Sequence, residues 1–334
     1  MSTRKTHPTK KSGGRPGSHP RSGSPRSSRP QPSAPKRATV GDWIRASRPA
    51  TLGLAFAPVA LGIGVAEFAL DFTDEPFLQP RPIALSVLAI LIAFFLQIGV
   101  NFANDYSDGV RGTDAHRVGP ARLVGSGAAS PARVLRAAIG FFAAAGVAGV
   151  AVAVITGFWW IIAVGAVSIV AAWFYTGGKR PYGYHALGEV VVFVFFGLVA
   201  TAGTAYILTG EIWWDSVLLG VAQGFFAMAV LLINNNRDRE TDIASGKRTL
   251  SVRVGPRVSR VLFAVFVAVP YVILGYFSLL FFLAPFVYMT LFLAIPTVLI
   301  GTMAAGPKDY VLALKLTVVT SLVFAVGLAA AVSF

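Results

Sequence analysis

The 334-residue chain contains no cysteine and only four histidines, and charged residues make up 13% of it. Without cysteine, the chain cannot form disulfides, thiolate metal sites or a cysteine nucleophile. The histidines (His7, His19, His116 and His185) do not cluster, so a zinc site is not expected, and no Walker-type Gly-rich loop is present. Soluble globular chains carry roughly 25% charged residues, which excludes an ordinary cytosolic enzyme.

Positive charge is concentrated at the N-terminus. Residues 1–48 contain 12 basic residues and one acid, whereas the other 286 residues carry a net charge of only +3. Residues 1–38 are mostly Ser, Pro, Gly, Arg and Lys, a composition that buries too little apolar surface to fold. We expect a disordered basic cytoplasmic tail that contacts anionic lipid head groups. Nucleic acid is not an expected partner, because no aromatic residues are interleaved with the basic ones. The tail also lacks the apolar segment of a secretory signal.

Long uncharged runs follow the tail. They cover residues 49–66, 82–104, 137–178, 190–210, 216–237 (up to its final Arg237), 261–307 and 316–334. A membrane span takes about 20 residues, so the runs 137–178 and 261–307 are each long enough for two. We expect their breaks at Thr156-Gly157-Phe158-Trp159 and near Leu283-Ala284-Pro285. The sequence therefore predicts an all-α, polytopic membrane protein with nine transmembrane helices over residues 39–334.

The charges of the loops are consistent with nine spans. Short cytoplasmic loops are enriched in Lys and Arg, and basic residues are found at 105–136, 176–186, 237–260 and near Lys308. On the opposite side the loops are mostly acidic: Glu67, Asp71, Asp74, Glu75, Glu211 and Asp215, with Arg81 as the one basic residue. We expect the N-terminus and the basic loops in the cytoplasm, and the C-terminus outside.

Two polar clusters stand at the cytoplasmic ends of the second and sixth expected spans. The first is N-F-A-N-D-Y-S-D, from Asn101 to Asp108, and includes Asp105. The second is N-N-N-R-D-R-E-T-D, from Asn234 to Asp242. Polar side chains at the membrane end of a span are costly, and they are functional candidates for that reason.

The spacing within the clusters is regular. Asn104 and Asp108 are four residues apart, as are Asp238 and Asp242, so each pair lies on one face of its helix. Asn104 precedes Asp238 by 134 residues, and Asp108 precedes Asp242 by the same number. This equal offset indicates a duplicated helix and loop. Because both pairs lie on the cytoplasmic side, we expect them to face each other across the bundle.

Carboxylate and amide oxygens suit Mg²⁺, which commonly takes further oxygen ligands from a phosphate. Nearby arginine and lysine side chains would neutralise the remaining phosphate charge. These are Arg111, Arg117, Arg122, Arg237, Arg239, Lys247 and Arg248. The combination of acids and bases predicts a diphosphate substrate at the membrane surface.

Other interpretations apply to the same residues. A single Asp or Asn at a helix end is usually a cap, and a basic residue after a cytoplasmic helix end is usually a topology signal. Two matched pairs on one side of a bundle favour a binding site instead. A transporter also uses intramembrane acids, but these tend to lie near the midplane of the membrane.

The two motifs resemble those of the UbiA superfamily of intramembrane prenyltransferases, an N-D-x-x-D motif and a D-x-x-x-D motif. Here they are Asn104-Asp105-Tyr106-Ser107-Asp108 and Asp238 with Asp242, and the similarity covers residues 40–334. The resemblance implies nine helices around a central lipid-accessible cavity, in which Mg²⁺ binds a prenyl diphosphate. Asn104, Asp108, Asp238 and Asp242 would then be the metal ligands.

Stretches beginning at Trp43, Asn101, Tyr182 and Asn235 resemble the branch of this superfamily that prenylates 1,4-dihydroxy-2-naphthoate in menaquinone synthesis. This implies transfer of a long polyprenyl group from polyprenyl diphosphate, with loss of CO₂ and diphosphate, to give demethylmenaquinone. Another acceptor, 4-hydroxybenzoate or a non-aromatic one, is the alternative. Gly112 departs from the wider superfamily pattern, in which many members have a third Asp.

We also assign hypothetical roles to individual residues. Asp108, Asp238 and Asp242 would act in catalysis through the metal. Glu189 would either orient or deprotonate the acceptor hydroxyl or form a structural hydrogen bond. The expected substrate-binding residues are Arg48, Asn101, Asp105, Arg117, Arg122, Lys179, Arg180, Lys247 and Arg248. The sequence does not indicate an oligomeric state.

Overall fold

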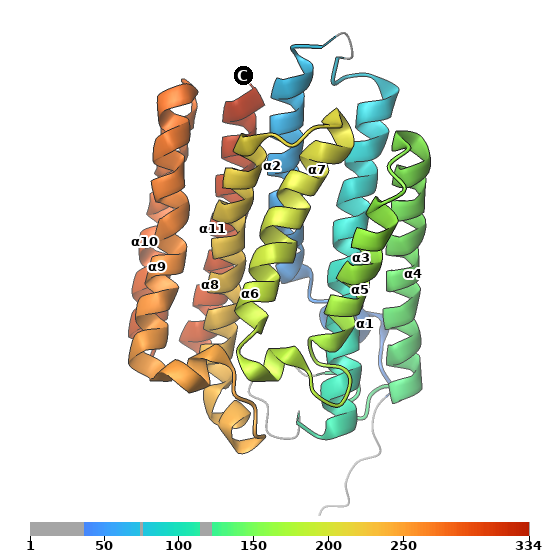
Figure 1. Cartoon of the computed structure of the whole chain (residues 1–334). Coiled ribbons are helices and arrows are strands. Elements are labelled where there is room, and N and C mark those ends of the chain that lie inside the picture. Colours follow the sequence, from blue (N-terminus) through green and yellow to red (C-terminus); the bar gives the residue numbers. More distant parts are fainter. Residues whose placement is uncertain (1–36, 74–75, 114–121, 334) are drawn as a thin grey trace, which may run out of the picture. The chain divides into compact units, whose positions relative to one another are not determined.

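The long uncharged runs form helices in the computed structural model, which describes residues 37–73, 76–113 and 122–333 (Figure 1). Within these ranges there is no strand, which confirms the expected all-α class. The expected tail falls almost entirely in residues 1–36 and, like Arg117, lies outside the described residues.

The first half of the described chain contains α1 (Val40–Ala46), the 3₁₀ turn η1 (Pro49–Thr51), α2 (Leu52–Leu70), α3 (Pro80–Arg111), α4 (Pro131–Thr156) and α5 (Ile161–Phe174). The second half contains the 3₁₀ turn η2 (Tyr182–His185), α6 (Gly188–Val192), the π-helical segment η3 (Phe193–Val199), α7 (Ala200–Thr209), α8 (Trp214–Ala244), α9 (Leu250–Leu280), the 3₁₀ segment η4 (Ala284–Thr290), α10 (Leu291–Met303) and α11 (Pro307–Ser333). Segments α6, η3 and α7 follow one another without a break and cross the bundle as one helix.

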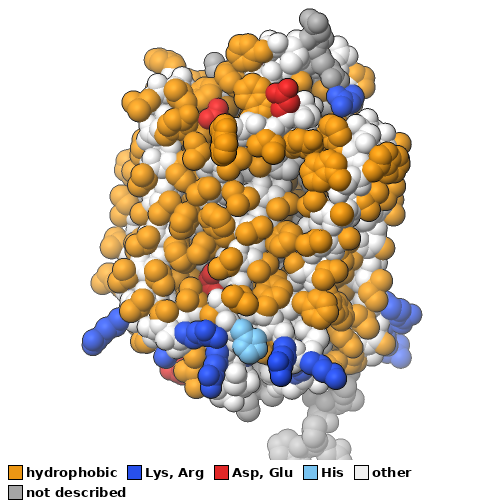
Figure 2. Space-filling model, in the orientation of Figure 1, with side chains coloured by type: hydrophobic (Ala, Val, Ile, Leu, Met, Phe, Trp, Pro, Cys, Tyr) orange, Lys and Arg blue, Asp and Glu red, His pale blue; other side chains and the backbone are white. Residues whose placement is uncertain are grey.

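Eight helical segments of the described chain are long and apolar enough to cross a membrane. The shorter apolar helix α5, with 14 residues, stands where the fourth of the nine expected spans was placed. Figure 2 shows an apolar surface along the helices, with most of the visible Lys and Arg side chains gathered at one end.

The helix ends follow local sequence signals. Pro131 begins α4 at a position where its missing N–H costs no hydrogen bond. Gly157, with φ of 76°, ends the same helix in a left-handed conformation that favours glycine. The expected break of the 137–178 run at Thr156-Gly157 is therefore confirmed. The break expected near Leu283-Ala284-Pro285 lies between α9 and η4.

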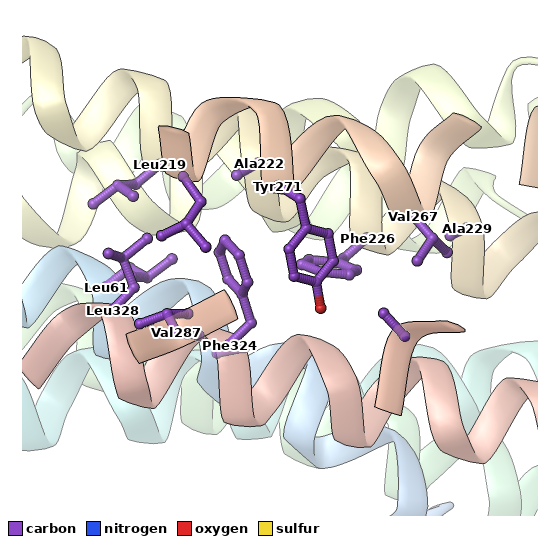
Figure 3. Close-up of a cluster of buried hydrophobic side chains, with 14 of the residues drawn as sticks. Leu61, Leu219, Ala222, Phe226, Ala229, Val267, Tyr271, Val287, Phe324 and Leu328 are labelled. Atoms are coloured by element: carbon purple, nitrogen blue, oxygen red, sulfur yellow. The ribbon is translucent and has the colours of Figure 1, made fainter. Parts of the chain in front are cut away.

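One side of the bundle is filled by a packed core. Phe226 of α8 and Phe324 of α11 are fully buried, and Tyr271 of α9 packs against both rings (Figure 3). Leu61 of α2 and Leu328 of α11 extend this core. The tight packing of α2, α8, α9 and α11 provides a rigid support for the second polar motif, which is carried by α8.

Candidate active site

A cavity of about 870 Å³ lies beside this core, between α2, α3, α4, α5, α8 and the segment from α6 to α7. Asp108 and Asp242 line one end of the cavity. Gly203 and Tyr206 of α7 line another part of its wall. Gly203 and Tyr206 lie 15 and 18 residues beyond Gly188, where α6 begins, which corresponds to roughly 25 Å along the helix. The cavity is thus polar at one end and mostly apolar along the rest. It suits a ligand with a charged head and a long apolar tail.

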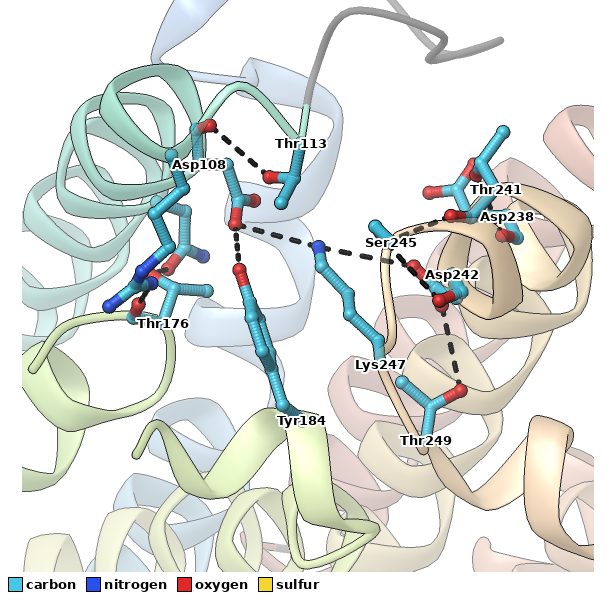
Figure 4. Close-up of polar contacts among 12 residues, drawn as sticks. Asp108, Thr113, Thr176, Tyr184, Asp238, Thr241, Asp242, Ser245, Lys247 and Thr249 are labelled. Carbon is cyan, nitrogen blue, oxygen red and sulfur yellow. Dashed lines mark hydrogen bonds and ion pairs between the residues drawn. The ribbon is translucent and has the colours of Figure 1, made fainter. Parts of the chain in front are cut away.

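The two polar motifs meet at the polar end. Lys247 Nζ lies 3.5 Å from Asp108 Oδ1 and 3.9 Å from Asp242 Oδ1 (Figure 4). Asn104 and Asp238 line the same cavity. The four residues expected as metal ligands therefore come together, from α3 on one side and α8 on the other.

Besides its contact with Lys247, Asp108 accepts hydrogen bonds from Arg122 and Tyr184. The Arg122 guanidinium donates to Asp108 Oδ2 at 2.6 Å and to the Asn104 carbonyl oxygen at 2.6 Å. The Tyr184 hydroxyl donates to Asp108 Oδ1 at 2.6 Å. Thr176 Oγ1 donates to Asn104 Oδ1 at 2.7 Å, so the first motif has a defined orientation.

The second motif has its own basic partner. Arg237 donates to both carboxylate oxygens of Asp238, at 2.7 and 2.6 Å. After α8 the chain turns through Gly246, with φ of 76°, and the Lys247 backbone N–H donates to the Asp242 carbonyl oxygen at 2.8 Å. This turn directs Lys247 back toward the acids. Thr249 Oγ1 lies 3.5 Å from Asp242 Oδ2.

Asp105 and Asn101 have different surroundings. Asp105 accepts hydrogen bonds from the backbone N–H groups of Leu123 and Val124, at 2.8 and 3.0 Å, and it is not among the residues that line the cavity. Its carboxylate therefore holds the backbone at Leu123 and Val124. Asn101 does line the cavity, and its amide donates to the Ser47 carbonyl oxygen at 2.9 Å.

The remaining basic candidates divide into two groups. Arg48 and Arg122 line the cavity with Lys247. Lys179 and Arg180 are exposed and are not brought to it. Arg248 is also exposed, and its backbone N–H donates to the Tyr184 carbonyl oxygen at 2.9 Å.

Glu189 lies at the start of α6 and is 2% exposed. Its Oε1 accepts a hydrogen bond from Asn235 Nδ2 at 3.0 Å. Asn235 lines the cavity and Glu189 does not, so the glutamate is connected to the cavity wall through the asparagine.

A turn rich in tyrosine forms part of the site. The stretch that begins at Tyr182 carried part of the resemblance, but none of its tyrosines was expected as a site residue. Tyr175, Tyr182 and Tyr184 all line the cavity. Burial, followed by the negative charge of Asp108, raises the pKa of Tyr184 well above its usual range, so its hydroxyl remains a donor. Arg111 donates to the carbonyl oxygens of Thr176 and Gly178 and lies 5.6 Å from the Tyr184 ring centroid. The sequence signal that could have identified this turn is the presence of three tyrosines within ten residues, in a loop that is also basic.

The oxygen ligands of the two motifs fit a hard divalent cation shared with a phosphate. In residues 37–73, 76–113 and 122–333, no three Asp, Glu or His side chains cluster closely enough to hold an ion by themselves. The Lys247 ammonium, however, stands between Asp108 and Asp242 as a cation contacting both motifs. Ligands from two sides, with the remainder from phosphate and water, match the usual coordination of Mg²⁺.

Solved structures share this fold. A UbiA homolog from Aeropyrum pernix aligns with a TM-score of 0.62 and 14% identity, over 82% of this chain and 96% of its own. A UbiA homolog from Archaeoglobus fulgidus bound to GPP and Mg²⁺ aligns with a TM-score of 0.58 and 18% identity, over 88% and 100%. The fold is therefore that of the UbiA helical bundle.

Sequence comparisons show the family. The model of the UbiA prenyltransferase family matches residues 55–305. A 1,4-dihydroxy-2-naphthoate octaprenyltransferase from Mycobacterium tuberculosis is 40% identical over 89% of this chain and 98% of its own length. A protein of the same name from Mycobacterium leprae is 46% identical over 68% and 74%. The chain belongs to the UbiA prenyltransferase family and is an integral multi-pass membrane protein.

Proposed function

We propose that the protein transfers a long polyprenyl group from a polyprenyl diphosphate to 1,4-dihydroxy-2-naphthoate, releasing CO₂ and diphosphate and forming demethylmenaquinol, the reduced form of demethylmenaquinone. The observation that carries this proposal is the cavity, which has two facing acidic motifs at one end and a mostly apolar lining that extends to Gly203 and Tyr206 of α7. The names of the two mycobacterial relatives support the naphthoate acceptor.

The polar end binds the diphosphate head of the donor. Asn104, Asp108, Asp238 and Asp242 would hold Mg²⁺, which neutralises the charge that develops on the departing diphosphate. Arg122 and Lys247 line the same end and supply positive charge for the phosphate oxygens. Arg48 is a further candidate for this role.

The aromatic wall protects the reacting carbon. The allylic C–O bond of the donor breaks, and positive charge develops on the prenyl group. Tyr175 and Tyr184 beside the acids, with Phe195 and Phe196 further along the wall, present rings that stabilise a cation and exclude water.

The acceptor is itself the nucleophile. Its ring carbon bonds to the prenyl carbon, and the carboxylate on that ring carbon leaves as CO₂. Glu189, connected to the wall through Asn235, would orient the acceptor hydroxyl or accept its proton.

We propose the cell membrane as the location, with the acidic end of the cavity and the basic tail in the cytoplasm and the C-terminus outside. Because the chain has no cysteine, single cysteines can report the orientation directly. An impermeant maleimide applied to intact cells should label Glu211→Cys and leave Ser126→Cys unlabelled, and the reverse pattern would contradict this orientation.

The test of the reaction uses purified protein, Mg²⁺, a polyprenyl diphosphate and a panel of aromatic acceptors, with products identified by mass. We expect prenylated, decarboxylated naphthoquinol from 1,4-dihydroxy-2-naphthoate. Consumption of 4-hydroxybenzoate instead would contradict 1,4-dihydroxy-2-naphthoate as the acceptor. It would still agree with prenyl transfer as the reaction. Full activity of the Asp108→Ala or Asp242→Ala protein would contradict the assignment of these residues as metal ligands.

A further inference from the structure

Lys247 occupies the point at which the two acidic motifs meet. Its ammonium lies 3.5 Å from Asp108 Oδ1 and 3.9 Å from Asp242 Oδ1, and its side chain is only 14% exposed (Figure 4). The Tyr184 ring centroid lies 4.6 Å from the same ammonium. These contacts place a protein cation between the carboxylates from α3 and α8.

The position of this cation has an electrostatic explanation. Asp108 is 2% exposed and Asp242 6% exposed, and buried carboxylates are costly unless a positive charge compensates them. Arg122 compensates Asp108 from one side and is also bound to the Asn104 carbonyl oxygen, which anchors it to α3. Lys247 contacts both motifs, and it projects from a turn rather than from a helix.

We propose that Lys247 is an internal counterion that competes with the divalent metal for Asp108 and Asp242, and that diphosphate relieves this competition by binding the lysine itself. Metal and diphosphate therefore bind cooperatively, and the metal binds poorly alone. This inference rests on the proposed function, since it assumes that the two motifs hold a metal and a diphosphate.

The geometry allows the exchange. Mg²⁺ needs carboxylate oxygens at about 2.0 to 2.1 Å, and it cannot take this position while an ammonium contacts the same oxygens. The lysine is a compact charge on a flexible four-carbon stem, so it can turn from a carboxylate to a phosphate oxygen without movement of the backbone. The face of Tyr184 remains beside the ammonium during this change. By linkage, the diphosphate must raise metal affinity by the same factor by which the metal raises diphosphate affinity.

Equilibrium dialysis with Mn²⁺ tests the proposal without turnover. Purified protein would be dialysed against Mn²⁺ with and without inorganic pyrophosphate, with a protein-free chamber measuring the solution complex. For the natural chain we expect weak Mn²⁺ binding that pyrophosphate strengthens. Lys247→Met should bind Mn²⁺ about tenfold or more tightly in the absence of pyrophosphate, and the strengthening by pyrophosphate should fall by a similar factor.

Lys308→Met is the matched control, because Lys308 is exposed and does not line the cavity. It should behave as the natural chain. Lys247→Gln provides a second variant that keeps a polar side chain if the methionine impairs folding. Unchanged or weaker Mn²⁺ binding by the folded Lys247 variants would overturn the role of Lys247 as a competing counterion and leave the proposed function intact. Absence of Mn²⁺ binding by the natural chain, even with pyrophosphate, would overturn the proposed function as well.

Discussion

At the residue scale, each of the three carboxylates expected as metal ligands has a basic partner. Asp108 contacts Arg122 and Lys247, and Asp238 contacts Arg237. Asp242 shares Lys247 with Asp108. These three carboxylates and their three basic partners carry equal and opposite charge. A metal ion together with a diphosphate disturbs this balance less than either charged species does alone, which favours their binding as a pair.

The hydrogen bond from Tyr184 to Asp108 should contribute to activity. Tyr184→Phe removes a donor at 2.6 Å from a buried carboxylate, and bonds to charged groups contribute about 1.5 to 3 kcal/mol. We expect kcat/KM for the prenyl donor to fall at least about tenfold. Tyr276→Phe, on the exposed face of α9, is the control. Equal kcat/KM in the two variants would show that the Tyr184 hydroxyl has no role in positioning Asp108.

The pH dependence of stability follows from the same turn. Burial raises the pKa of Tyr182 and of Tyr184 above the value of the unfolded chain. Their contribution to stability is therefore complete below about pH 10 and is lost as the unfolded chain ionises at higher pH. The thermal unfolding temperature should be level from about pH 7 to 9.5 and should fall above about pH 10. Tyr182→Phe should reduce that fall, and an identical decline in this variant would contradict the assignment.

At the scale of elements, the spans could be predicted because hydropathy and charge decide which segments enter a membrane. The run 137–178 divides at Gly157, as its Thr-Gly signal indicated. The π-helical segment η3 could not be predicted, because hydropathy carries no information on the hydrogen-bond register within a helix. The same applies to the non-helical Gly255, with φ of 78°, inside α9.

Helix η3 packs against α8 through glycine. A Cβ added to Gly197 would lie 2.4 Å from the Gly220 carbonyl oxygen and 2.6 Å from Gly224 Cα. Gly197→Ala should therefore separate the two helices and destabilise the protein by about 1 to 3 kcal/mol, measured by thermal unfolding in detergent. Gly140→Ala on α4 has open space around its Cβ and should be neutral or slightly stabilising. Equal stability of both variants would contradict the close approach of η3 and α8.

The site was predictable only in part. The i,i+4 spacing of Asp108 with Asn104, and of Asp242 with Asp238, was readable because helix geometry relates nearby residues. The contacts of Tyr184 were not, because they join segments 76 residues apart. Asp105 lies next to Asn104 in sequence but points to the loop after α3, since adjacent residues on a helix face different directions.

At the scale of the whole molecule, the cavity runs from the acids to the far end of α7. Gly203 lines it, and a Cβ added there would meet nothing within 4 Å. Gly203→Phe should obstruct a long prenyl tail and leave room for a short one. The kcat/KM for a long polyprenyl diphosphate should fall about tenfold or more relative to that for geranyl diphosphate. Equal losses for both donors would contradict the path assigned to the tail.

The central claim is that the motifs on α3 and α8 bind one diphosphate together through divalent ions. The most direct test is equilibrium binding of farnesyl diphosphate to the purified protein without acceptor. We predict binding that requires Mg²⁺, is abolished by EDTA, and weakens at least about tenfold in both Asp108→Asn and Asp242→Asn. Asp309→Asn, which alters the acid that accepts hydrogen bonds from the turn before α11, should bind normally. Unchanged affinity in either motif variant, or Mg²⁺-independent binding, would contradict the claim.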